Sequence, residues 1–179
     1  MGRSDSITSA REQVLHHFRW IDGHADTWAM LADAESLSAV VRGLTELARP
    51  ERPDVIVGIE SRGFLLGPAV AVALGIGFVP VRKDGAAFPG DIIRQETAPD
   101  YRGNQRILST RSDLIRPGHR VVLIDDWIET GSQSLAAAQL VAACGGDLAA
   151  IVVVVDEAYE TARGLLPPIR SVVRARDLQ

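Results

Sequence analysis

One segment near the end of the sequence is apolar at almost every position. Residues Ile151–Val155 are all isoleucine or valine, and a second run, Val121–Ile124, is equally apolar and ends in two acids. Strands without polar positions are buried on both faces, as in a parallel sheet that is covered by helices. The two runs therefore predict strands over Ala149–Asp156 and Arg120–Asp126 in an α/β fold.

Shorter apolar segments alternate with these two expected strands. β-Branched and aromatic residues indicate four further strands, at Val55–Glu60, Phe78–Arg82, Ile107–Ser109 and, at an edge of the sheet, Ser171–Arg174. Small apolar residues indicate two helices, at Phe64–Leu74 and Ser132–Cys144. This alternation is typical of a parallel sheet flanked by helices. We expect one domain over residues 1–179, with its core at residues 54–156.

Residues 1–50, which we call the hood, are expected to be mainly helical. The expected helices are Ser6–Arg19 and Ala34–Ala48. Apolar side chains at helical spacing share one face of each: Val14, Leu15 and Phe18 in the first, and Leu37, Val40, Val41, Leu44 and Leu47 in the second. Between the helices, Trp20–Ala32 has no clear period, so we expect it to be irregular.

Residues Asp84–Asn104 are expected to form a long flexible loop. The segment has three glycines, two prolines, many charges and no period. A loop of this length in a compact domain is usually functional, which favours a lid over the site rather than a simple connection.

Composition excludes several classes of protein. The net charge of −4 argues against a protein that binds nucleic acid by neutralising its phosphates. The single cysteine, Cys144, cannot form an intrachain disulfide. No stretch reaches about 18 apolar residues, so we expect no membrane partner, and the polar N-terminus favours a cytoplasmic location.

The acids that end the second apolar run are followed by a polar turn. Asp125 and Asp126 lead to Thr130-Gly131-Ser132, where the next helix is expected to begin. The first N–H groups of a helix lack partners inside it and carry a partial positive charge, so this turn suits a phosphate. The neighbouring carboxylates suit a diol, and the two together describe a ribose 5-phosphate. The alternative is that Ser132 only caps the helix and that the acids are solvated.

Two other strand ends carry cations. Ser61, Arg62 and Gly63 follow the first core strand, and Arg82 and Lys83 end the next one. Taken alone, the first cluster is more typical of an ordinary helix cap with a solvated arginine, and the second would pass for a surface turn. Because parallel strands place their carboxyl ends at one edge of the sheet, the three clusters together suit a sugar with phosphates at both ends.

Two segments carry a resemblance to a known family. Val57–Gly85 is similar to adenine phosphoribosyltransferases throughout, and Val121–Gln133 resembles the phosphoribosyl-pyrophosphate motif of type I phosphoribosyltransferases. The resemblance implies a glycosyltransferase that moves a phosphoribosyl group from phosphoribosyl pyrophosphate to a purine or purine-like base, with adenine leading. It also implies a Mg²⁺ cofactor and a homodimer. The alternative is a regulator of the same fold that binds phosphoribosyl pyrophosphate without catalysis.

The resemblance also implies roles for individual residues. Asp125 and Asp126 would hold the ribose hydroxyls, and no side chain is expected to bind the metal alone. The 5-phosphate would lie on the turn and helix start formed by Thr130, Gly131, Ser132, Gln133 and Ser134. Ser61, Arg62 and Gly63 would meet the pyrophosphate or the base, while Arg82 and Lys83 would face the pyrophosphate. In the loop, Asp100 beside Tyr101 would take the proton of the base.

Three residues depart from the family's motif. Trp127 stands in place of a small or aliphatic residue, Glu129 in place of alanine and Gln133 in place of threonine. We expect Glu129 to take a proton or accept a hydrogen bond from the base, the alternative being that it points to solvent. Glu157 and Tyr159, after the last core strand, are further candidates to line the site. Trp20 and Trp28 either stack on the base or pack the hood.

Overall fold

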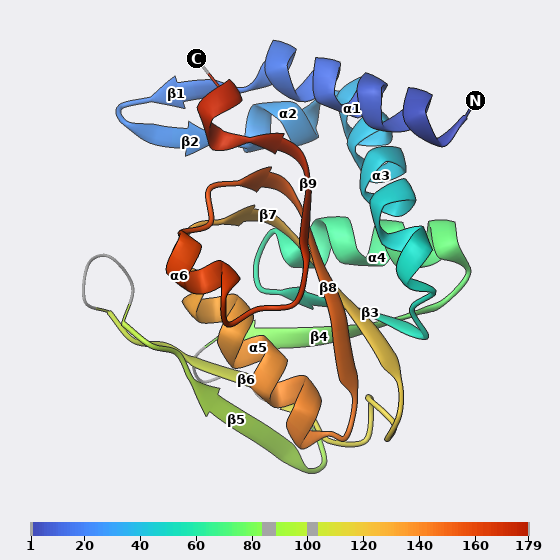
Figure 1. Ribbon diagram of the computed structural model, residues 1–179, viewed down its shortest axis with the longest axis vertical. Coiled ribbons are helices and arrows are strands. Elements are labelled where there is room, and N and C mark those ends of the chain that lie inside the picture. Colours follow the sequence, from blue (N-terminus) through green and yellow to red (C-terminus); the bar gives the residue numbers. More distant parts are fainter. Residues whose placement is uncertain (1, 84–88, 100–103, 179) are drawn as a thin grey trace.

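The computed structural model describes residues 2–83, 89–99 and 104–178, and it contains a mixed seven-stranded sheet (Figure 1). The strand order is β5-β6-β4-β3-β7-β8-β9. Five strands are parallel: β3 Val55–Ile59, β4 Gly77–Lys83, β7 Arg120–Ile128, β8 Asp147–Asp156 and β9 Ile169–Arg174. Two strands are antiparallel additions beside β4: β5 Ile92–Glu96 and β6 Ile107–Arg111.

Helices cover both faces of this sheet, as the two apolar runs predicted. On one face, Val122 and Ile124 of β7 pack with side chains of α1 Arg3–His17, α3 Ala34–Ala48 and α4 Gly63–Leu74. On the other face, Val121 and Leu123 pack with side chains of α5 Ser132–Ala143. Alternate residues of one strand thus enter two cores, which is why neither face tolerates a polar position.

The remaining short elements lie mostly at the two chain ends. They are β1 Arg19–Ile21, β2 His24–Asp26, α2 Trp28–Ala32, η1 Arg49–Glu51, α6 Glu160–Arg163 and η2 Ala175–Asp177. Figure 1 shows the hood at one end of the molecule, beside the C-terminus. An ion pair of 2.9 Å between Arg11 of α1 and Asp177 of η2 joins these two ends of the chain.

The expectation that Trp20–Ala32 is irregular is wrong, because it contains a hairpin and a short helix. Strands β1 and β2 pair antiparallel, with Ile21 opposite His24. The two residues between them, Asp22 and Gly23, have positive φ values of 50° and 75°. That conformation matches the right-handed twist of a two-residue hairpin, and Asp-Gly is one of the dipeptides that favour it. The expected first helix also ends at His17 rather than Arg19, since Phe18 is already extended.

Two residues of the expected apolar faces of the hood helices are exposed. Leu15 is 39% exposed and Leu37 is 36% exposed, whereas Val14, Val40 and Leu44 are fully buried. The buried face of each of α1 and α3 therefore contains fewer residues than its apolar pattern indicated.

The expected loop over residues 84–104 is also partly wrong. Residues Ile92–Glu96 form β5, which pairs with β6 from Ile92 opposite Arg111 to Glu96 opposite Ile107. The lid assignment concerns the rest of the segment, of which residues 84–88 and 100–103, including Asp100 and Tyr101, lie outside the described residues. Within the described ranges, no helix is both long and apolar enough to cross a bilayer.

Candidate active site

A cavity of about 670 Å³ lies at the carboxyl ends of β3, β4 and β7 and extends to the hood. Most of the predicted site residues line it: Ser61, Arg62, Lys83, Asp125, Asp126, Glu129, Thr130, Gly131, Ser132, Gln133 and Ser134. The structure thus brings the three expected clusters to one place, as the parallel strands require.

The turn that precedes α5 presents backbone N–H groups to this cavity. Gly131 is the residue before the helix and has a φ of 72°, a conformation that favours glycine. Ser132 does not cap the helix, because it is the first residue of the helix and Gly131 occupies the cap position; its hydroxyl accepts a hydrogen bond from Thr130 at 3.1 Å. Among the described residues, the N–H groups of Gln133 and Ser134 have no acceptor. Unpaired N–H groups at a helix start form an anion site, so we call Thr130–Ser134 the phosphate turn.

Helix α6 packs against the phosphate turn and fixes its position. A side chain at Gly131 would come within 2.9 Å of Ala162 and 3.0 Å of Leu166. The guanidinium of Arg163 donates to both oxygens of buried Asp156, at 2.7 and 2.8 Å. This ion pair anchors α6 to the end of β8, and the absence of a side chain at Gly131 lets α6 approach.

The two acids at the end of β7 have different surroundings. Asp126 is 3% exposed, and its carboxylate accepts a hydrogen bond from the Thr27 hydroxyl at 3.1 Å and forms an ion pair with Arg62. Asp125 accepts a hydrogen bond from the backbone N–H of Asp126 at 2.9 Å. Burial, followed by the negative charge of Asp126, raises the pKa of Asp125 well above its usual range.

Of the cations expected to face the pyrophosphate, Lys83 lines the cavity and Arg82 does not. Successive residues of a strand point to opposite faces, so the two side chains point in different directions. The guanidinium of Arg82 pairs with Glu60 at 3.5 Å. Burial lowers the pKa of Lys83, although the charge of Asp125 opposes this shift and that of Arg106 adds to it.

Gly63, which we expected to contact the ligand, packs closely against the ends of two strands. It is the first residue of α4, and a side chain there would come within 3.0 Å of the carbonyl oxygen of Ile124 and 3.1 Å of Gly58. Its close approach to β3 and β7 places Ser61 and Arg62 at the cavity while Gly63 itself stays outside the lining.

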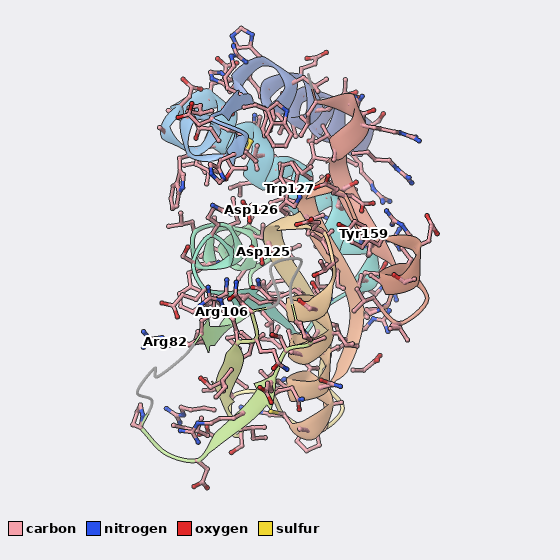
Figure 2. All side chains as sticks on the ribbon, turned by 90° about the vertical axis from the view of Figure 1, so that its left-hand side faces the viewer. Arg82, Arg106, Asp125, Asp126, Trp127 and Tyr159 are labelled. Atoms are coloured by element: carbon pink, nitrogen blue, oxygen red, sulfur yellow. The ribbon has the colours of Figure 1, made fainter. Side chains whose placement is uncertain are left out.

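The sequence analysis missed Arg106, which acts electrostatically on Lys83. Arg106 directly precedes β6, and β6 pairs antiparallel to β4 with Leu108 opposite Lys83. The start of β6 therefore lies beside the end of β4. Figure 2 shows Asp125, Asp126 and Trp127 between the hood and the two arginines, Arg82 and Arg106.

The hood end of the cavity is aromatic. The ring of Trp127 lies 6.0 Å from those of Phe18 and Trp20, and the Phe18 and Trp20 rings are 5.2 Å apart. Trp20 lines the cavity, whereas Trp28 lies over the guanidinium of Arg62 at 5.8 Å. Trp20 is thus placed where it could meet a ligand in the cavity, whereas Trp28 packs on a cation.

Glu129, which departs from the family's motif, and Glu157, which follows the last core strand, both line the cavity and accept hydrogen bonds. Glu157 accepts a hydrogen bond from the Trp127 indole N–H at 2.9 Å, and Glu129 accepts one from the Tyr159 hydroxyl at 3.2 Å. The bond to Glu129 raises the pKa of Tyr159. Glu129 therefore does not simply point to solvent.

Comparison with known proteins places this cavity in a family. Residues 27–172 match the phosphoribosyl transferase domain. An adenine phosphoribosyltransferase of Clostridium perfringens is 40% identical over 131 residues, 73% of this chain and 74% of that protein. One from a Synechococcus strain is 42% identical over 150 residues, 83% of this chain and 86% of that protein.

Solved structures show the same relationship. The crystal structure of the adenine phosphoribosyltransferase of Thermoanaerobacter pseudethanolicus has a TM-score of 0.83 at 30% identity and covers 92% of this chain and 99% of its own. The enzyme of Trypanosoma brucei, solved in complex with AMP, pyrophosphate and ribose-5-phosphate, has a TM-score of 0.79 at 26% identity, covering 95% of this chain and 81% of its own. The phosphate turn, the acid pair and these relatives together assign the chain to the phosphoribosyl transferase domain family, and it is a phosphoribosyltransferase.

Proposed function

We propose that the protein transfers the 5-phosphoribosyl group of phosphoribosyl pyrophosphate to adenine and releases pyrophosphate. The bond from ribose C1 to the pyrophosphate oxygen breaks, a bond from C1 to the base nitrogen forms, and the nitrogen loses its proton. The observation that carries this proposal is that the phosphate turn and the acid pair share one cavity with an aromatic wall. The naming of the relatives supports adenine as the base.

The contacts around the cavity suggest how the sugar is oriented. The 5-phosphate accepts hydrogen bonds from the N–H groups of Gln133 and Ser134, and the ribose hydroxyls face Asp125 and Asp126. Lys83 and the end of β3, at Ser61 and Arg62, then lie where the pyrophosphate leaves. In this placement all three clusters contact the phosphoribosyl pyrophosphate, and the aromatic wall is left to contact the base.

The electrostatics of the acid pair favour the reaction. As pyrophosphate leaves, the sugar becomes positively charged at C1, and fixed negative charges nearby stabilise that charge without reorganisation. Asp126 forms an ion pair with Arg62 and accepts a hydrogen bond from the Thr27 hydroxyl. Asp125 holds its proton more tightly, because it is buried beside Asp126, and hydrogen bonds from the ribose hydroxyls would favour its ionised form.

The residues present fit Mg²⁺ as a cofactor that enters with the substrate. Mg²⁺ is usually bound by one or two carboxylates together with substrate phosphates, and Asp125 and Asp126 offer such carboxylates at the cavity. Bound there, it would neutralise the charge of the departing pyrophosphate. Within the described residues, no group of three or more His, Cys, Asp or Glu side chains could hold a metal ion alone.

Proton removal from the base is assigned to Asp100, beside Tyr101, which lies outside the described residues and stays a prediction. A homodimer and a cytoplasmic location are likewise predictions, and light scattering of the purified protein tests the first. A regulator without catalysis is not favoured, because the curated relatives are transferases.

The decisive experiment is a panel of bases incubated with phosphoribosyl pyrophosphate and Mg²⁺, with pyrophosphate release and the nucleotide product as readouts. We expect turnover with adenine. Binding of phosphoribosyl pyrophosphate without turnover of any base would overturn the proposal in favour of the regulator.

A further inference from the structure

Trp127 and Glu157 are joined across two neighbouring strands at the cavity wall. Beyond the end of β8, the backbone N–H of Glu157 donates to the carbonyl of Ile128 at 2.9 Å, so the pairing with β7 continues by one residue. This register sets the Glu157 carboxylate against the indole of Trp127, whose N–H donates to Oε2 at 2.9 Å. Glu157 is itself exposed, so this bond to the indole is the contact that orients its carboxylate at the cavity wall.

The place of this pair in the cavity follows from the other walls. The phosphate turn occupies one end, and Asp125, Asp126 and Lys83 occupy the middle. The remaining wall is formed by Trp127, Glu157 and hood residues that include Trp20 and His24. On the proposed function, on which this inference rests, that wall is the one left for the base.

The chemistry of the pair selects what the base must present. A carboxylate only accepts hydrogen bonds, and the indole N–H only donates. Since that N–H is already directed at Oε2, the pair offers the cavity an acceptor, Oε1, which has no hydrogen-bond partner among the described residues. A base with an N–H donor is favoured at this wall, and a base with an oxygen there places acceptor against acceptor.

We propose that Glu157, held in place by Trp127, is a specificity-determining residue for the base, and that its carboxylate accepts a hydrogen bond from an exocyclic amino group. It selects 6-aminopurines over 6-oxopurines, whose oxygen would replace the amino donor. Trp127 is a positioning residue that acts through Glu157. Sites built to hydrogen-bond one group discriminate strongly against analogues that lack it.

The test compares kcat/KM for adenine and hypoxanthine in the parent and in Glu157→Gln. Glutamine keeps the size but adds an N–H donor that can meet an oxo group. We expect the ratio of adenine to hypoxanthine efficiency to fall by about 10-fold or more, while KM for phosphoribosyl pyrophosphate stays within about twofold. Glu160→Gln is the matched control: its side chain is 92% exposed, it does not line the cavity, and the ratio should not change.

Trp127→Phe tests the positioning role, because it removes the indole N–H and keeps an aromatic ring. The ratio should fall by less than in Glu157→Gln. Because Trp127 acts through Glu157, the double variant should have nearly the same ratio as Glu157→Gln alone. An unchanged ratio in Glu157→Gln, in an enzyme that uses adenine, would overturn this inference alone. A parent that turns over no base would instead overturn the proposed function and this inference with it.

Discussion

The backbone N–H of Asp126 donates a hydrogen bond to Oδ1 of Asp125 at 2.9 Å, yet the two carboxyl groups have different partners. Asp126 is paired with the cation of Arg62, whereas Asp125 is buried beside the negative charge of Asp126. One acid therefore has a cation beside it, whereas the pKa of the other is raised by burial and by the neighbouring charge. Substitution of either acid by asparagine should therefore reduce catalysis, but the two substitutions should affect stability differently.

Asp125→Asn should lower turnover by about 10²-fold, because it removes a negative charge that would face the developing cation. It should leave the melting temperature at neutral pH unchanged or higher, since the amide carries no charge to be buried next to Asp126. Steady-state kinetics and thermal unfolding measure the two effects. Turnover within twofold of the parent would mean that Asp125 is only the end of a strand.

Asp126→Asn should lower turnover to a similar extent but should also destabilise the protein. It leaves the guanidinium of Arg62 without its carboxylate, and Arg62 is only 35% exposed. We expect a loss of about 1–3 kcal/mol in the free energy of unfolding, the usual cost of losing a hydrogen bond to a charged group. Chemical denaturation of the two asparagine variants side by side checks the contrast, and equal stabilities would contradict it.

The raised pKa of Asp125 predicts a pH dependence of stability. The unfolded chain loses this proton near the ordinary value of 3.8, and the native protein loses it at higher pH. The stabilisation is fully present below 3.8 and is lost as pH rises through the native pKa, because the native state binds the proton more tightly than the unfolded state. Glu51, whose pKa is lowered from 4.5 chiefly by its hydrogen bond to Arg170, acts in the opposite direction and at lower pH.

Thermal unfolding of the parent and of Asp125→Asn over a series of pH values from 3.8 upward therefore isolates Asp125. The parent should lose stability relative to Asp125→Asn as pH rises through this range. Parallel curves for the two proteins would show that the carboxyl of Asp125 ionises at its ordinary pKa.

Sequence patterns predicted the centre of the fold but not its periphery. Strands β7 and β8 were identified because nearly all of their residues enter one of two cores. The two strands of the hood hairpin have three residues each, and all three residues of β1 are exposed, so they show no apolar pattern. Asp22-Gly23 was therefore the only sign of the hairpin in the sequence. In β5, the charges of Arg94 and Glu96 hid a strand that lies at the edge of the sheet.

The site was predictable where its residues are neighbours in sequence. The acid pair lies within β7 and the phosphate turn comes soon after it in the sequence, so their spacing alone brought them together. Thr27 reaches Asp126 from 99 residues away, and Arg106 acts on Lys83 because β6 pairs with β4. Such contacts depend on which strands pair, and the composition of a single strand does not encode that.

Phosphoribosyl pyrophosphate with Mg²⁺ should raise the melting temperature, because one ligand would occupy the phosphate turn, the acid pair and Lys83 together. A ligand at 100 times its Kd stabilises the native state by about 2.7 kcal/mol. Ribose 5-phosphate and pyrophosphate, each added alone, are the controls and should produce smaller shifts. The absence of any shift at millimolar phosphoribosyl pyrophosphate would contradict the assignment of the cavity.

Glu129 and Tyr159 form a hydrogen-bonded pair beside the phosphate turn, where the family's motif has alanine in place of Glu129. The pKa of Tyr159 is raised by this bond, so its hydroxyl remains a donor throughout the neutral and mildly alkaline range. Because Glu129 lines the cavity close to the acid pair in sequence, its charge adds to the field that favours a positive sugar.

Glu129→Ala should therefore lower kcat/KM with adenine by about 3- to 10-fold, the effect of a single additional charge near the reacting centre. Tyr159→Phe should act in the same direction but less strongly, since it removes only the group that orients the carboxylate. The double variant should be no worse than Glu129→Ala, because residues that act as a unit give non-additive losses. The preference for adenine over hypoxanthine should stay within about twofold of the parent in all three, since that choice is assigned to Glu157. A change of base preference in Glu129→Ala would instead place its carboxylate against the base, and parent-like kinetics would make the pair a bystander.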